Sequence, residues 1–199
     1  MILNHIWGLY THPKDEWQLI EKRHESLGYS LMHILMIALI PAICSYYAAA
    51  HIGWTIGVGD PIKISVSSAK MMAISMYFSI IIGVFALAYL IQWMAKTFDS
   101  KPDFVQALEL AAYTATPLLM VGVTALFPVL WFVAIAVLAA VAYSIYLLYS
   151  GVPIMMNIPE EKGFIYSSSV VTCGLVLLVA LMAFTALMWT MGFGPEFTS

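Results

Sequence analysis

A carboxylate stands inside an apolar stretch of this chain. Glu109 lies within DFVQALELAAYTATPLL, which runs from Asp103 to Leu119. Ionisable side chains are rare in membrane segments, and by default they indicate a functional site. At spacings of 3, 4 and 3 residues, one face of a helix would carry Gln106, Glu109, Tyr113 and Thr116. These residue types can hold a proton, a cation or a lipid headgroup.

Other apolar segments offer polar groups at a similar depth. From the same side of a bilayer, Glu109 would lie about 8 Å into its helix, and His33 and Gln92 about 6 Å into theirs. Ser144 and Thr172 stand at comparable levels in two further segments. We predict a polar pocket in which Glu109 bonds to one of its neighbours, with the candidate ligand-binding residues Glu109, His33, Gln92, Tyr113 and Thr116. The alternative is that Glu109 snorkels to the membrane edge.

Catalytic and metal-binding signatures are missing from the sequence. It contains no HExxH, GxSxG or Walker A motif, and its five histidines have no metal-ligand spacing. The pairs Met71–Met72 and Met155–Met156 could bind a soft metal, but methionine is common in apolar segments. Cys44 and Cys173 are best interpreted as apolar fillers. We therefore expect no enzyme activity, no catalytic residues, no metal site and no cofactor.

The composition identifies the elements that position these residues. Of the 199 residues 62% are hydrophobic and only 10% are charged, whereas soluble domains carry about 25% charged residues. Segments of about 20 apolar residues span a bilayer, and they must be helical to satisfy their backbone in lipid. We predict an all-α membrane protein with five transmembrane helices in one compact bundle, at about residues 29–50, 71–95, 104–126, 129–149 and 169–191.

Prolines and a capping motif punctuate this pattern. Pro41 and Pro117 are expected to kink their helices, and Pro128 separates the third and fourth spans by a tight turn. Ser100 and Asp103 resemble a capping box that would start the third helix near Lys101.

The N-terminal segment, residues 1–28, carries an amphipathic pattern. Pro13 suits a first helical turn, and one face of the helix would then carry Trp17, Ile20, His24 and Leu27. We predict a helix on the membrane surface with Trp17 at the interface; the alternative is a helix packed under the bundle. No signal peptide is apparent, so the first span is expected to act as an uncleaved anchor. The tail, residues 192–199, is either native or a cloning scar.

The distribution of basic residues predicts the orientation. The N-terminal side of the five spans would carry six basic residues and the opposite side two, Lys63 and Lys70. Because basic residues favour the cytoplasm, we predict a cytoplasmic N-terminus and an external C-terminus. Five tryptophans fall near segment ends, where such rings anchor to the interface: Trp7, Trp54, Trp93, Trp131 and Trp189.

Two stretches resemble a known family. THPKDEWQLIEK resembles the P-x-x-x-W-x-x-I start of Yip (Ypt-interacting protein) domains, and AAYTATPLLMVGVTALFP resembles their Y-x-x-T-P-L-L element with a later Gly and Pro. The matching positions are Pro13, Trp17, Ile20, Tyr113, Thr116, Pro117, Leu118, Gly122 and Pro128. The first loop and the stretch YLLYSGVP after the fourth span are similar to a bacterial inner-membrane branch of this family. The resemblance implies a five-helix domain with a cytoplasmic N-terminus, and it supplies no catalytic residues.

Two classes of function follow. The first is a non-enzymatic scaffold or adaptor of the bacterial inner membrane. Its partners would be membrane lipids, other membrane proteins or a second copy of the chain. The second is a small transporter or channel that uses the pocket around Glu109. Eukaryotic relatives are similar to adaptors for prenylated small GTPases, but we do not extend that partner to this chain. Nucleic acid is not an expected partner, because the sequence has no basic stripe.

Overall fold

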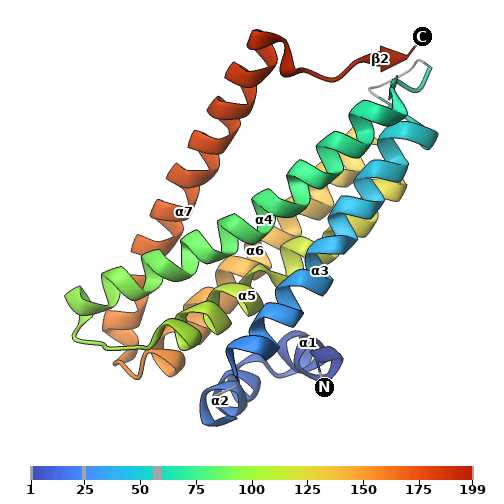
Figure 1. Cartoon of the computed structure of the whole chain (residues 1–199). Coiled ribbons are helices and arrows are strands. Elements are labelled where there is room, and N and C mark those ends of the chain that lie inside the picture. Colours follow the sequence, from blue (N-terminus) through green and yellow to red (C-terminus); the bar gives the residue numbers. More distant parts are fainter. Residues whose placement is uncertain (1, 24–25, 56–59, 199) are drawn as a thin grey trace.

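The computed structural model describes residues 2–23, 26–55 and 60–198 and is a bundle of long helices (Figure 1). Within these residues five helices are long and apolar enough to cross a membrane, at Leu27–Ile52, Val66–Phe98, Phe104–Leu126, Leu130–Met155 and Glu160–Gly192. These candidate spans agree with the five predicted segments and with the predicted all-α architecture. The α-helices are α1 (Ile2–Thr11), α2 (Pro13–Arg23), α3 (Leu27–Tyr47), α4 (Val66–Ala95), α5 (Phe104–Met120), α6 (Leu130–Met155) and α7 (Glu160–Met188). Short 3₁₀ or π turns extend the spanning helices at Ala48–Ile52, Lys96–Phe98, Val121–Leu126 and Trp189–Phe193.

Helix α5 is the centre of the bundle and contacts α3, α4 and α6. In its most apolar window 61% of the residues are buried inside the protein, against 6% for α7, although α5 has the lowest hydropathy of the five. The burial of α5 explains its low hydropathy, because a helix that its neighbours shield from lipid can carry polar side chains. The start of α5 differs from the prediction. Asp103 and Gln106 form the capping box, whereas the Ser100 hydroxyl donates to the Met156 carbonyl.

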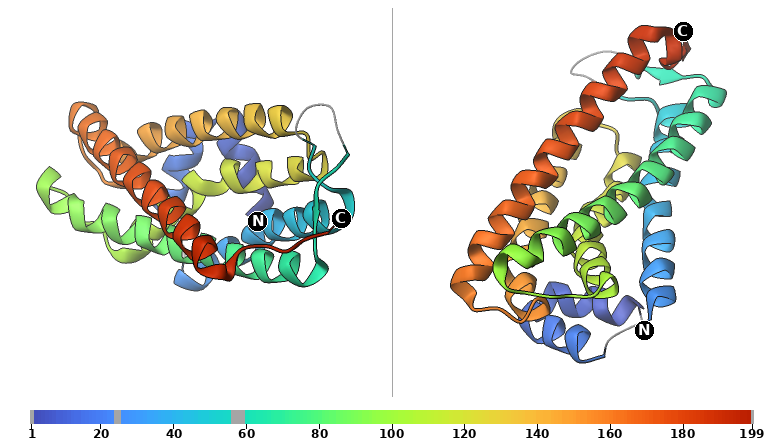
Figure 2. Two further views of the ribbon diagram at one scale, coloured as in Figure 1. Left: turned by 90° about the horizontal axis from the view of Figure 1, so that it is seen from above. Right: turned by 60° about the vertical axis from the view of Figure 1, so that its left-hand side comes forward.

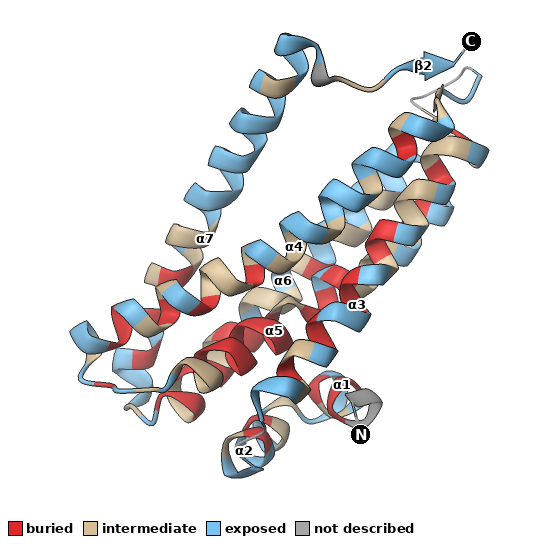
Figure 3. Cartoon of the chain, viewed as in Figure 1, coloured by how far each residue is buried: buried red, intermediate tan, exposed pale blue. Residues whose placement is uncertain are grey.

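The N-terminal helices α1 and α2 lie across one end of the bundle (Figures 1 and 3). We call them the cover, this end the covered end, and the opposite end the far end. Trp17 and Ile20 are completely buried, and α2 packs against α6. The prediction that these side chains face the membrane surface is wrong, and the packed alternative is the one observed. The reason is that an apolar helix face gains as much from protein contact as from lipid. His24 lies outside the described residues, and Leu27 begins α3 and is exposed.

Glycines and prolines mark close crossings at both ends. A Cβ on Gly122 would lie 2.6 Å from the Pro41 Cβ and 2.7 Å from its Cα, so Gly122 lets the turn after α5 pass directly over α3. The Pro128 carbonyl accepts hydrogen bonds from the backbone N–H and the hydroxyl of Thr55. Pro13 is the first residue of α2, and Pro117 lies inside α5, one turn before its 3₁₀ extension.

Helix α7 packs at its base and then leaves the bundle (Figures 1 and 2). Near the covered end Gly163 sits against Pro153, and the Tyr166 hydroxyl donates to the Ile91 carbonyl. From Leu175 to Leu187 nearly every residue is exposed, so the expected single compact bundle is only partly observed. The sequence there is apolar on every side and specifies no face for packing. The chain then returns, and β2 (Phe197–Thr198) pairs antiparallel with β1 (Lys63–Ile64).

Candidate functional site

His33 of α3 and Thr116 of α5 form a buried hydrogen bond in the covered half of the bundle. The His33 Nε2 and the Thr116 Oγ1 lie 2.9 Å apart, and the Thr116 hydroxyl donates to the Ala112 carbonyl, also at 2.9 Å. Since a hydroxyl has one proton, Thr116 must accept from His33, and Nε2 is therefore the protonated nitrogen. The other ring nitrogen, Nδ1, has no hydrogen-bond partner among the described residues.

Tyr113 links this pair to the rest of the site. Its ring centroid lies 4.6 Å from that of His33 and 5.9 Å from that of His5. Glu109 stands four residues before Tyr113 and therefore on the same face of α5. Glu109 is only 1% exposed, so its carboxylate does not snorkel out of the protein. His33, Tyr113 and Thr116 therefore lie together, with Glu109 buried one turn away on the same face of α5, and ligand binding by these residues stays a prediction.

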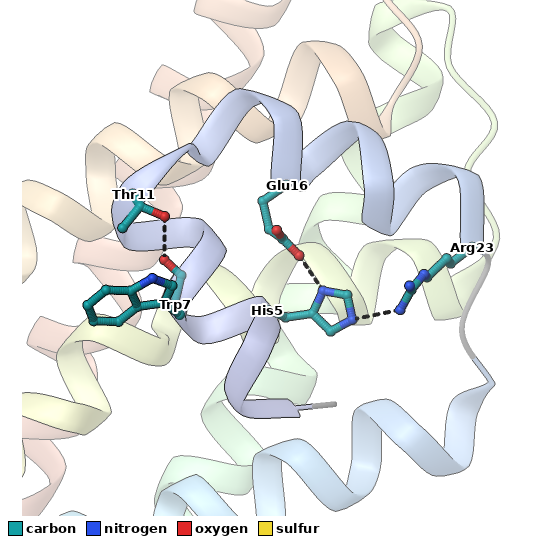
Figure 4. A network of polar contacts seen from close by, with 5 residues as sticks. All are labelled: His5, Trp7, Thr11, Glu16 and Arg23. Carbon is teal, nitrogen blue, oxygen red and sulfur yellow. Dashed lines mark hydrogen bonds and ion pairs between the residues drawn. The ribbon is translucent and has the colours of Figure 1, made fainter.

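The cover brings three further ionisable groups, His5, Glu16 and Arg23, that the sequence did not indicate as part of this site. His5 of α1 is 2% exposed, and its Nδ1 pairs with the Glu16 carboxylate of α2 (Figure 4). An Nη1 of Arg23 lies 3.5 Å from the other ring nitrogen of His5. We refer to His5, Glu16, His33, Glu109, Tyr113 and Thr116 as the polar cluster.

Gly8 permits the contact between His5 of α1 and Glu16 of α2. A Cβ at Gly8 would collide with the carboxylate of Glu16. The glycine therefore leaves the space through which Glu16 reaches His5. Glu16 is itself largely enclosed, with 13% of its side chain exposed.

Trp17 fixes the cover to the bundle. Its indole N–H donates to the Ser150 Oγ at 3.2 Å, and its ring meets the Tyr113 ring edge to face at 6.4 Å. A Cβ on Gly151 would lie 2.6 Å from this indole, so only a glycine at this position lets the ring pack directly against α6. The Tyr143 hydroxyl adds a second attachment by donating to the Leu9 carbonyl at 2.7 Å. Burial and the neighbouring Tyr143 raise the pKa of Tyr10, which stacks on the Tyr143 ring.

Other predicted members lie elsewhere. The Gln92 amide is directed to the Pro102 carbonyl at 3.5 Å, and Gln106 serves the capping box. Thr172 is exposed and donates to the Ser168 carbonyl of its own helix. Ser144 is half-buried with no hydrogen-bond partner among the described residues. Equal depth in five helices therefore did not mean a common site, because depth gives no information on which way a side chain points.

The cluster can hold charge and protons, but the Thr116 hydroxyl accepts from His33 and donates to the Ala112 carbonyl, so His33 is not placed to take the Thr116 proton. The cluster combines two imidazoles, two carboxylates and a phenol in surroundings that exclude water. Among residues 2–23, 26–55 and 60–198, no three His, Cys, Asp or Glu side chains gather in a way that could hold a metal ion. A salt bridge between Lys162 and Asp99, at 2.6 Å, lies outside this site on the exposed surface. Lys162 lowers the pKa of Asp99.

Comparison with known proteins adds two findings. Residues 7–181 match the Yip1 domain. The chain is 35% identical over 192 residues to the inner membrane protein YohC of Escherichia coli strain K12, covering 96% of this chain and 98% of that protein. The inner membrane protein YohC of Escherichia coli O6:H1 gives the same identity and coverage. No solved structure gives a significant match.

Proposed function

We propose that this chain, which belongs to the Yip1 domain family, is a non-enzymatic scaffold or adaptor of the bacterial inner membrane that binds lipids or other membrane proteins. The observation that supports this most is the enclosure of the polar cluster. His5, His33 and Glu109 are each at most 2% exposed, and hydrogen bonds join His5 to Glu16 and His33 to Thr116. A site that binds a soluble substrate needs a route to water, whereas a structural cluster does not.

The outer surface supports the same proposal. Large apolar side chains are exposed along α3, α4, α6 and α7, including Phe78, Leu138 and Met182. On five spanning helices these faces are in contact with lipid or with other membrane proteins. The splayed outer part of α7 leaves more of this surface available than a closed bundle would.

The inner membrane and the orientation are part of the proposal. The covered end carries Lys14, Lys22 and Arg23 of α2, Lys96 and Lys101 between α4 and α5, and Lys162 in the first turn of α7, whereas the far end carries Lys63 and Lys70. We propose that the covered end is cytoplasmic, by the preference of basic residues for that side. Alkaline phosphatase fused after Met191 should then be active, and phosphatase fused after Gly163 should be inactive. The reverse pattern would overturn the orientation.

A small transporter is the second candidate, and one observation favours it. His33 Nδ1 is buried and has no hydrogen-bond partner among the described residues, so it can accept a proton in the middle of the cluster. A conducting protein would need this nitrogen and Glu109 to meet water from both sides.

A flux measurement separates the two candidates. The purified protein is reconstituted into vesicles, and proton, sodium and potassium fluxes are recorded against protein-free vesicles. The scaffold proposal expects no flux above the protein-free level. A flux that appears with the protein and disappears in the Glu109→Gln variant would overturn the proposal in favour of transport.

A further inference from the structure

An apolar groove runs between α3 and α4 on the far half of the bundle, where the two helices lie side by side (Figure 1). Its volume is about 370 Å³, within the roughly 300–1,000 Å³ of small-molecule pockets. Ala42 of α3 and Ala73 of α4 are the smallest side chains of the lining, and larger residues at these positions would fill part of the space. The remaining lining residues are Leu39, Ile43, Tyr46, Lys70, Ile74, Tyr77 and Phe78.

The groove has the length of a single leaflet. Lys70 lies near the start of α4, and Phe78 lies eight residues further along. At 1.5 Å per residue the groove is about 12 Å long. This is close to the thickness of one leaflet, which is about 15 Å, or half of a hydrocarbon core of about 30 Å. Toward the middle of the helices the Tyr77 hydroxyl, which belongs to the lining, donates to the Leu35 carbonyl across α3 and α4.

The mouth of the groove is basic. Lys70 is its one charged lining residue. Lys70 and Lys63, which lies on β1 just before α4, are the two basic residues of the far end. The acids of this end, Asp60 and Glu196, do not line the groove. An apolar channel of one leaflet's depth with a cation at its mouth is complementary to a lipid whose chain is apolar and whose headgroup is anionic.

We infer that the groove between α3 and α4 binds one acyl chain of an anionic phospholipid, with the phosphate held by Lys70. Ala42 and Ala73 seat the chain, and the Lys70 stem lies along the apolar wall while its ammonium reaches the headgroup. This inference rests on the lipid-binding part of the proposed function, and it specifies the lipid and the site.

Native mass spectrometry of the full chain in detergent tests it. The protein is titrated with dioleoyl phosphatidylglycerol, which is anionic, and with dioleoyl phosphatidylethanolamine, which is zwitterionic. We expect the first phosphatidylglycerol to bind at least ten-fold more tightly than the first phosphatidylethanolamine. Lys70→Gln should remove this preference, and Ala73→Phe should fill the groove and weaken the binding of both lipids. Lys101→Gln, which removes an exposed cation from the other end, is the matched control and should behave as the wild type.

Four results would overturn the inference. The first is an unchanged preference for phosphatidylglycerol in Lys70→Gln, and the second is unchanged binding in Ala73→Phe. Equal affinity of the wild type for both lipids would also overturn it, as would a second copy of the chain being displaced by Ala73→Phe instead of lipid. These outcomes leave the flux test untouched, so failure here and failure of the proposed function are distinguishable.

Discussion

The two ends of the bundle solve the same problem in opposite ways. At the covered end α1 and α2 close over polar groups, and Trp17, Tyr113 and Tyr166 are completely or almost completely buried. At the far end α7 stands apart, and Trp131 is 67% exposed. One end keeps charge out of lipid by wrapping it in protein, whereas the other has little charge to hide and leaves its apolar surface open. We infer that the helices of this protein pack closely where they carry polar side chains and stay apart where they are wholly apolar. The length of a helix does not decide which of the two occurs.

The largest expected effect on stability comes from replacing Trp17, which attaches the cover to α6. Trp17→Ala deletes a fully buried indole and its hydrogen bond to Ser150, and loss of a buried Trp costs about 3–5 kcal/mol of the free energy of unfolding. The control is Trp131→Ala at the far end, where an exposed substitution should change stability by less than about 0.5 kcal/mol. Thermal unfolding in detergent measures both. Similar losses for the two variants would show that the ends are packed alike.

A second test changes the charge under the cover. Glu109→Leu places an apolar side chain among groups that need hydrogen bonds, which should cost about 1–3 kcal/mol. Glu109→Gln keeps the hydrogen-bonding shape and should be milder. Glu161→Leu, at an exposed position on the first turn of α7, serves as the control. Wild-type stability and lipid binding for both Glu109 variants would mean that the acid has no role in the cluster.

The smallest test compares two glycines of the spanning helices. A Cβ at Gly122 meets the backbone of Pro41, whereas a Cβ at Gly83 has nothing within 4 Å. Gly122→Ala should therefore destabilise by about 1 kcal/mol through overpacking. Gly83→Ala should stabilise by roughly 0.5–1 kcal/mol, because glycine is a poor helix former. Chemical unfolding distinguishes the signs, and equal effects would remove Gly122 as the close crossing point.

Much of the fold was accessible from the sequence because the bilayer imposes a strong constraint. A run of apolar residues long enough to span is helical whatever it packs against, so all five spans were predicted. The face shared by Glu109, Tyr113 and Thr116 also follows from helix geometry alone. His33 was predicted from its depth, and the structure confirms that it lies beside Thr116.

The rest depended on contacts that no local pattern encodes. Residues 1–12 gave no strong signal, yet His5 reaches across to Tyr113, more than a hundred positions away. Trp17 has the same amphipathic pattern whether lipid or α6 covers it, so burial under the bundle could not be distinguished from the membrane surface. For α7, an apolar sequence on all sides indicates a span but no packing face. For Gln92, the position along the helix did not reveal that its amide is directed to the Pro102 carbonyl.

Chemical labelling of a buried position tests the enclosure of the polar cluster most directly. Cys44 and Cys173 are replaced by Ala, and single cysteines are introduced by Thr116→Cys in the cluster, Lys101→Cys at the covered end and Ser67→Cys at the far end. A water-soluble maleimide is applied from each side of the membrane. We predict labelling of the Lys101→Cys variant from one side, of the Ser67→Cys variant from the other, and of the Thr116→Cys variant from neither until the protein is unfolded. Labelling of the Thr116→Cys variant in the folded protein at a rate comparable to either control would contradict the account, because the cluster would then be open to water.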